Sequence, residues 1–377
     1  MGIIRALLAI SVLITHSGKI FGVRMLNGDM AVTCFFVISG FLMGLIVTEK
    51  YKSIKDFYIN RALRIYPAYL LAVILSYIAF TLFPQGSHNP PMVLTRAIEH
   101  KGFIWIIWSA ISNVSLLGID LTRYIKVAQD YSILFPNFLH GGGGGGHNLL
   151  LVPQAWTLAL EFYFYLIVPF VVKLRTPKLV AATAFFFILR WQAHAFFNKI
   201  NLPVDDSSIF IFQVQYFLIG VVSYRLYAWF RSAGMKKNWK DILGSTSFTV
   251  GLLMVFGGYD IFGNKEQWLV DIFYTAFAVL LPFIFYWCNK TFSSLDKTIG
   301  DYSYPVYLFH YMVAKSLLLL TSDKWYGELS LAITLVISFL YLFFIDNHVQ
   351  RLRVTIAEKS TKKRKLGMQP ESIPVNS

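Results

Sequence analysis

The sequence has few charged residues and almost no cysteine. Asp, Glu, Lys and Arg make up 14% of its 377 residues, which is roughly half of the share usual in soluble globular domains. A chain with so little charge cannot cover its exterior with polar groups, so much of that exterior must face lipid. The two cysteines, Cys34 and Cys288, lie in or at the edge of apolar runs. This composition excludes a soluble enzyme, a nucleic-acid-binding protein and a disulfide scaffold.

Long apolar runs take the place of the missing charge, since hydrophobic residues make up 56% of the chain and aromatic residues 17%. About ten of these runs are long enough to cross the ~30 Å hydrocarbon core of a bilayer. The sequence therefore predicts an all-α polytopic membrane protein of about ten transmembrane helices. The first run lacks a small-residue cleavage site and is interpreted as a retained span rather than a signal peptide. The predicted spans are residues 3–21, 29–47, 64–83, 155–173, 178–196, 209–228, 242–262, 267–287, 303–320 and 328–347.

The distribution of basic residues predicts the topology. The formal net charge is +14, and 23 of the 34 Lys and Arg fall on one side of the membrane if both termini are cytoplasmic. Cytoplasmic segments carry the excess of Lys and Arg in membrane proteins. A further apolar segment, residues 103–118, would invert every later loop if it crossed fully. We therefore expect it to be a re-entrant or interfacial helix.

The predicted domain organisation is one membrane domain, residues 1–350, followed by a basic cytoplasmic tail, residues 351–377. Residues 84–154 are expected to form an extracytoplasmic loop, whose glycine run Gly141–Gly146 is interpreted as a flexible linker. The tail is typical of a segment that anchors on anionic lipid. We find no internal repeat, which argues against many transporter folds.

Two ionisable residues share the first span. Arg5 and His16 are eleven residues apart, about 16 Å along a helix axis and close to three turns, so their side chains should point in nearly the same direction. Ionisable groups inside a membrane are costly and indicate function by default. The alternative is a buried histidine that donates to a backbone carbonyl.

Arg61 and Arg64 at the entry to the third span share a helix face. Guanidinium groups suit phosphate oxygens, and with Arg5 they could form a three-arginine phosphate site at the cytoplasmic mouth. A phosphate carrier with a long flexible arm, such as coenzyme A, could bind there and reach His16. The alternative is that these arginines only fix the topology.

Two more ionisable residues are predicted inside spans. Glu161 follows Trp156 in an aromatic segment, and such a carboxylate must be paired or have a raised pKa. It could orient His16 or bind a sugar hydroxyl, or it could form an ion pair with Arg190 or Lys315. His310 competes with His16 for a catalytic role, and His16 is favoured for its spacing from Arg5.

Five sequence blocks in this order resemble the acyltransferase 3 family, membrane-bound enzymes that O-acetylate surface polysaccharides and other sugars. The chain departs from the family pattern in lacking the acidic-glycine lead-in before the first arginine, which suggests a start further upstream. It also carries no hydrolase-like C-terminal domain, so we expect any second transfer step either to need a partner or not to occur. The blocks are Arg5-x10-His16, Phe35 to Phe41, Arg61-x-x-Arg64 with Tyr66-Pro67, Trp156-Thr157-Leu158 through Glu161 to Pro169, and Ser303-Tyr304-x-x-Tyr307-Leu308-x-His310.

The resemblance implies transfer of an acyl group, usually acetyl, from cytoplasmic acyl-CoA to a hydroxyl of a saccharide acceptor on the outer side. It implies that His16 is the catalytic histidine and that Arg5, Arg61 and Arg64 bind the acyl-CoA co-substrate. We expect Glu161 to orient the His16 ring or to bind the acceptor, and we expect no metal to take part. It also implies a multi-pass protein of a bacterial inner membrane. Substrate contacts are expected from Trp156, Tyr304 and His310.

Two mechanisms and two other functions remain open from the sequence. His16 could act directly as a general base on the sugar hydroxyl, or the acyl group could first rest on a protein side chain. The direct version is favoured because no well-placed nucleophile stands out. A transporter or flippase for a lipid-linked saccharide would use the same buried charges as ligands. A structural subunit of an export complex predicts that His16 is dispensable.

Overall fold

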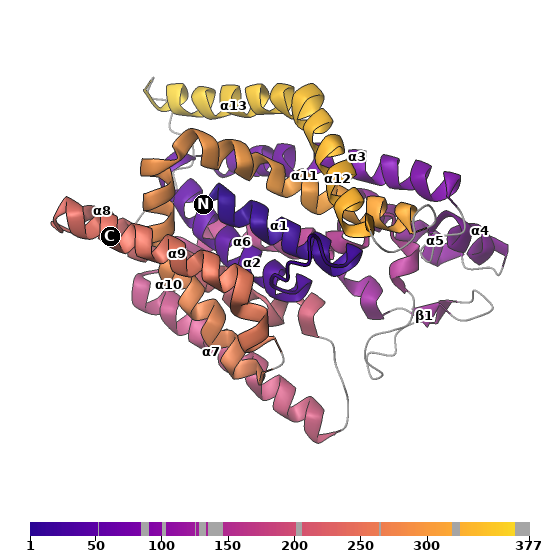
Figure 1. Ribbon diagram of the computed structural model, residues 1–377, viewed down its shortest axis with the longest axis horizontal. Coiled ribbons are helices and arrows are strands. Elements are labelled where there is room, and N and C mark those ends of the chain that lie inside the picture. Colours follow the sequence, from indigo (N-terminus) through magenta and orange to yellow (C-terminus); the bar gives the residue numbers. More distant parts are fainter. Residues whose placement is uncertain are drawn as a thin grey trace.

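The computed structural model describes residues 1–51, 53–83, 90–99, 103–124, 126–127, 133–134, 146–200, 206–263, 265–318 and 325–365. Within these ranges the chain is a bundle of α-helices, with one pair of two-residue antiparallel strands, β1 (Lys126–Val127) and β2 (Ile133–Leu134). Figure 1 shows α1, α2 and α6 in the middle of the bundle. The helices are α1 (Gly2–Ser17), α2 (Gly28–Leu45), α3 (Ile54–Leu82), α4 (Pro90–Glu99), α5 (Phe103–Ser115), α6 (Trp156–Val171), α7 (Thr176–Lys199), α8 (Val214–Ser232), α9 (Lys237–Phe262), α10 (Gln267–Thr291), α11 (Ser293–Leu317), α12 (Tyr326–Tyr341) and α13 (Asn347–Lys365).

Each of the ten predicted spans overlaps one of these helices. In the described ranges, seven helical segments are long and apolar enough to cross a membrane, and the chain is a multi-pass membrane protein. The helix α1 has 16 residues and falls short of the predicted span. It ends just before Gly18, whose φ of 79° is a positive value that glycine adopts more readily than other residues. The count of ten spans and the cytoplasmic location of both termini stay predictions.

Most of the apolar segment 103–118 forms α5, which ends at Ser115 and is too short to cross a bilayer. Its 13 residues make a helix of about 20 Å, against a hydrocarbon core of ~30 Å. The α5 helix packs beside α3, because the Tyr69 hydroxyl donates to the carbonyl of Asn113 (2.6 Å) and the Tyr66 hydroxyl to that of Ser115 (2.8 Å). Residues 141–145 of the predicted glycine linker lie outside the described residues.

The α2 and α8 helices cross at a pair of glycines. A Cβ atom at Gly40 would lie 1.9 Å from the carbonyl oxygen of Phe217, and one at Gly220 would lie 2.1 Å from that of Val37. Only residues without side chains allow two helix backbones to approach so closely. This contact explains why the Phe35–Phe41 block contains a glycine, Gly40. It also holds α2 in place against α8.

Gly40→Ala should therefore destabilise the protein by about 2–3 kcal/mol, the upper part of the range for overpacking a core, because the obstructing atom belongs to a backbone. Thermal unfolding of the purified protein in detergent would measure this. Gly257→Ala on α9 is the matched control, since a Cβ there meets no atom within 4 Å and alanine favours a helix. Equal thermal stability of the two variants would contradict the predicted clash.

The α1 and α11 helices run parallel and in close contact. The Cα of Gly2 would lie 2.7 Å from a Cβ at Gly300, and the rings of His16 and His310 lie 5.3 Å apart near the other ends of the two helices. This packing sets the register between two segments that are far apart in the sequence.

The last helix, α13, turns away from α12 after a π-helical turn at Leu342–Asp346. Figure 1 shows it running along one edge of the bundle. It lies against α3, because Asn60 Nδ2 donates to the Arg353 carbonyl (3.3 Å) and Arg353 Nε donates to Asn60 Oδ1 (3.3 Å). The segment assigned to the basic tail therefore begins as a helix docked on the bundle.

Candidate functional site

A cavity of about 320 Å³ lies between α1, α2, α3, α6, α11 and α13. This volume is in the range of small-molecule binding pockets. It brings together the three arginines that the sequence assigned to one site, Arg5, Arg61 and Arg64. They come from two helices, α1 and α3, that are not neighbours in the sequence.

The cavity is strongly cationic. Sequence reasoning missed Lys50 and Arg353 because basic residues at the ends of spans look the same whether they fix the topology or bind a ligand. With five cations against two carboxylates, the described lining has an excess of three positive charges. Such a lining favours a ligand with several negative charges. The cations are Arg5, Lys50, Arg61, Arg64 and Arg353, and the carboxylates are Glu161 and Asp301.

Arg61 is buried without a carboxylate partner in the described part of the chain. Its side chain is 7% exposed, Nη2 donates to Asn60 Oδ1 (2.9 Å), and Nε has no hydrogen-bond partner among the described residues. A guanidinium carries five N–H donors, and burying an unpaired charge is costly. An anionic ligand would satisfy both the charge and the free donor.

Arg64 and Tyr304 form one wall of the cavity. The Arg64 guanidinium lies over the Tyr304 ring, 5.6 Å from its centroid, and the Tyr304 hydroxyl donates to the carbonyl of Ile65 (2.8 Å). Tyr304 therefore links α11 to α3 and holds Arg64 beside the cavity.

Glu161 lies on the cavity side of α6, where its carboxylate accepts hydrogen bonds from the Ser39 and Tyr165 hydroxyls (2.6 Å each). Neither of the cations considered as its ion-pair partner is among these contacts. Glu161 is also close enough to Arg5 for the two opposite charges to attract. Two hydroxyl donors and a nearby cation stabilise a carboxylate away from bulk water.

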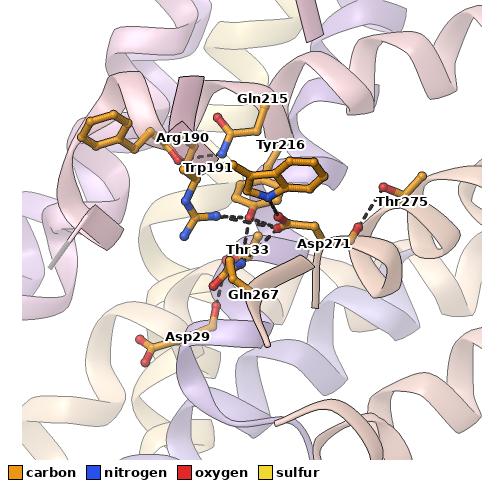
Figure 2. A network of polar contacts seen from close by, with 10 residues as sticks. Asp29, Thr33, Arg190, Trp191, Gln215, Tyr216, Gln267, Asp271 and Thr275 are labelled. Atoms are coloured by element: carbon orange, nitrogen blue, oxygen red, sulfur yellow. Dashed lines mark hydrogen bonds and ion pairs between the residues drawn. The ribbon is translucent and has the colours of Figure 1, made fainter. Parts of the chain in front are cut away.

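Arg190 belongs to a separate buried network, shown in Figure 2. It forms an ion pair with Asp271 (3.8 Å) and a hydrogen bond with the Tyr216 hydroxyl. Asp271 accepts from Tyr216 (2.5 Å), from Trp191 Nε1 (2.8 Å) and from Gln267 Nε2 (3.0 Å). This network ties α7, α8 and α10 together and does not include Glu161.

His16 and His310, treated as rivals in the sequence, lie side by side with ring centroids 5.3 Å apart. His310 is fully buried, and its Nδ1 lies 2.7 Å from the Tyr307 carbonyl. A carbonyl only accepts, so this nitrogen carries the proton and Nε2 is the basic one. Nε2 has no partner among the described residues. His16 lies in the last turn of α1, where its side chain is exposed and its ring meets Tyr311 edge-on.

One layer of side chains separates the histidine pair from the cavity. Tyr307 lines the cavity, and its ring lies 5.9 Å from that of His310. Its hydroxyl is hydrogen-bonded to Thr157 (2.6 Å) and to the carbonyl of Gln154 (2.8 Å). Trp156, at the start of α6, is half-buried, meets Phe36 edge-on at 6.4 Å, and is outside the cavity lining.

Comparison with known proteins gives a family match over most of the chain. The sequence model of a family described as "Acyltransferase domain" (Acyl_transf_3) matches residues 1–345. A Staphylococcus aureus (strain COL) protein named "Putative O-acetyltransferase SACOL0978" is 26% identical over 336 residues, which are 82% of this chain and 49% of that protein. The "O-acetyltransferase OatA" of Staphylococcus aureus (strain NCTC 8325 / PS 47) is 24% identical over 347 residues, again 82% of this chain and 49% of that protein.

An "Uncharacterized protein" of Haemophilus influenzae is 33% identical over 159 residues, which are 41% of this chain and 53% of that protein. The chain thus spans about half the length of the curated relatives it matches. No solved structure matches it.

Proposed function

The chain belongs to the acyltransferase family whose sequence model it matches over residues 1–345, and from this premise we propose that it is a membrane O-acyltransferase. It transfers an acyl group, by preference acetyl, from cytoplasmic acyl-CoA to a hydroxyl of a sugar in a surface polysaccharide or a related glycoconjugate. The proposed location is a bacterial inner membrane, crossed ten times with both termini cytoplasmic.

The observation that carries this proposal is the cationic cavity with an unpaired, buried Arg61. Coenzyme A carries several phosphate groups and a long arm of methylene and amide groups. Its binding site therefore needs cations at the entrance and a narrower channel that leads inward. The described lining supplies Arg5, Arg61 and Arg64 together near one end of α1 and α3. Guanidinium groups bind phosphate oxygens with two parallel hydrogen bonds, which fits the free donors of Arg61.

On the donor side, the three arginines would bind the phosphates, and the arm would extend along α11 toward Tyr307. Glu161, held by Ser39 and Tyr165, would act on this side by keeping Arg5 in place beside the arm. To meet the acceptor, the thioester must then pass the layer formed by Tyr307 and Thr157. The hydrogen bond between these two hydroxyls is the contact that we expect to open.

On the acceptor side, the exposed ring of His16 would meet a sugar hydroxyl and remove its proton as the oxygen attacks the thioester carbon. The new C–O bond forms as the C–S bond breaks, and the proton passes from His16 to the CoA thiolate. Buried His310 would hold the ring of His16 in position by packing against it, with the two ring centroids 5.3 Å apart. Holding both reactants in place lowers the entropic cost of this step.

The test is consumption of the acetyl-CoA thioester by the purified protein in liposomes. We expect CoA release that depends on an added glycan acceptor, with acetyl ester appearing on the glycan. Release without any acceptor product would mean hydrolysis rather than transfer. If no acyl-CoA binds or turns over while a lipid-linked saccharide crosses the membrane, the protein is a transporter and the proposed function is wrong.

A further inference from the structure

The helix that follows the last predicted span contributes to the cationic cavity. Arg353 and Gln350 of α13 both line it, although Arg353 falls in the segment that the sequence predicted to be only a basic tail. The π-helical turn before α13 changes the direction of the chain, and α13 then lies against α3. One face of α13 is therefore part of the binding site.

Arg353 and Arg61 converge on a single oxygen. Asn60 Oδ1 accepts from Arg61 Nη2 at 2.9 Å and from Arg353 Nε at 3.3 Å. Asn60 is 1% exposed, so this amide is a fixed point between the two arginines. Two guanidinium groups held on one neutral acceptor repel each other.

Asp346 is an acid close enough to attract Arg353, and it is hydrogen-bonded to two neutral groups. Asp346 accepts hydrogen bonds from Gln350 Nε2 (2.7 Å) and from the Tyr341 hydroxyl (3.4 Å). In the described ranges, no carboxylate forms an ion pair with Arg61 or Arg353. Among the described residues, the two guanidinium groups thus form no ion pair with a carboxylate, and they face a cavity that can hold an anion.

We propose that Arg353 and Arg61 together bind one phosphate group of the acyl donor, so that α13 supplies the part of the site that recognises the nucleotide end of coenzyme A. The proposal rests on the proposed function, since it assigns a residue to the donor of that reaction. Arg353 binds the donor and takes no part in the acyl transfer itself. Its loss therefore affects donor affinity and not the rate at saturation.

The test compares CoA binding by calorimetry, and KM and kcat for acetyl-CoA, in the full-length protein in detergent. Arg353→Gln should weaken CoA binding and raise KM about 10-fold, as expected for losing hydrogen bonds to a charged group, with kcat unchanged. Arg353→Lys should recover part of the affinity, because lysine keeps the charge but not the planar fork. Arg351→Gln is the matched control, since Arg351 is exposed on the same helix and should bind CoA as the wild type does.

The outcomes separate this proposal from the proposed function. A wild-type protein that binds no CoA overturns the proposed function. A wild type that binds CoA with an affinity equal to that of Arg353→Gln overturns only the role of Arg353. Equal losses in Arg353→Gln and Arg351→Gln would mean a general electrostatic effect, which also overturns it. If Arg353→Gln does not fold, the CoA affinity of Arg353→Lys tests the proposal instead. An unchanged affinity in that variant would exclude binding of the phosphate through the planar guanidinium group.

Discussion

His16→Ala should lower acceptor-dependent acyl transfer by about 10²–10⁴-fold, the range that general base catalysis contributes, while CoA binding stays unchanged. The reason is the separation seen in the structure: the cavity that we propose for the donor is lined by Arg5 of α1, whereas His16 lies near the other end of that helix. Measuring CoA release and CoA affinity on the same preparation would show both effects.

Two further histidine variants sharpen this result. His348→Ala is the matched control, because His348 is exposed on α13 and its Nδ1 lies 3.1 Å from the Phe344 carbonyl; its activity should match the wild type. His310→Ala should lower kcat less than His16→Ala if His310 only positions the other ring. Transfer that persists in His16→Ala and disappears in His310→Ala would assign the base to His310 instead.

The positions of the helices could be predicted from the sequence, because a run of apolar residues long enough to cross a bilayer leaves few other options. The exact ends could not. The predicted first span continued to residue 21, but α1 ends at Ser17. Consequently His16 lies in the exposed last turn of α1.

The pairing of His16 with His310 could not be predicted, although both were recognised as ionisable groups inside spans. Their proximity depends on which helices pack together and in what register. The decisive contact is the close approach of Gly2 and Gly300, two glycines without a distinctive sequence environment. Treating the two imidazoles as alternatives was the consequence of seeing each helix alone.

Only part of the cationic cavity could be predicted from the sequence. Its three arginines could be grouped by spacing and by expected depth, since Arg61 and Arg64 share a helix face. Lys50 and Arg353 could not be assigned to this site from the sequence, because every span end on the predicted cytoplasmic side carries basic residues. Only the turn that brings α13 back onto α3 distinguishes Arg353 from its exposed neighbour Arg351.

Arg61→Gln should raise KM for acetyl-CoA about 10- to 100-fold, since hydrogen bonds to a charged group contribute about 1.5–3 kcal/mol, and it should also change stability in an unusual direction. A buried cation without a carboxylate partner is unfavourable in the ligand-free protein. The ligand-free variant should therefore unfold at the same temperature as the wild type or at a higher one. Saturating CoA should stabilise it less, because each tenfold loss of affinity removes about 1.4 kcal/mol of ligand-dependent stabilisation.

Thermal unfolding with and without CoA would measure both effects in one experiment. Lys55→Gln is the matched control: Lys55 is exposed in the first turn of the same helix and should leave both temperatures unchanged. A ligand-free Arg61→Gln protein that unfolds earlier, together with an unchanged response to CoA, would show that Arg61 stabilises the fold through Asn60 and does not bind the donor. If the ligand-free Arg61→Gln protein unfolds no earlier than the wild type and CoA stabilises it less, the fold maintains the charge of Arg61 for a ligand. In that case the unpaired charge destabilises the ligand-free protein and contributes to stability only when the ligand binds.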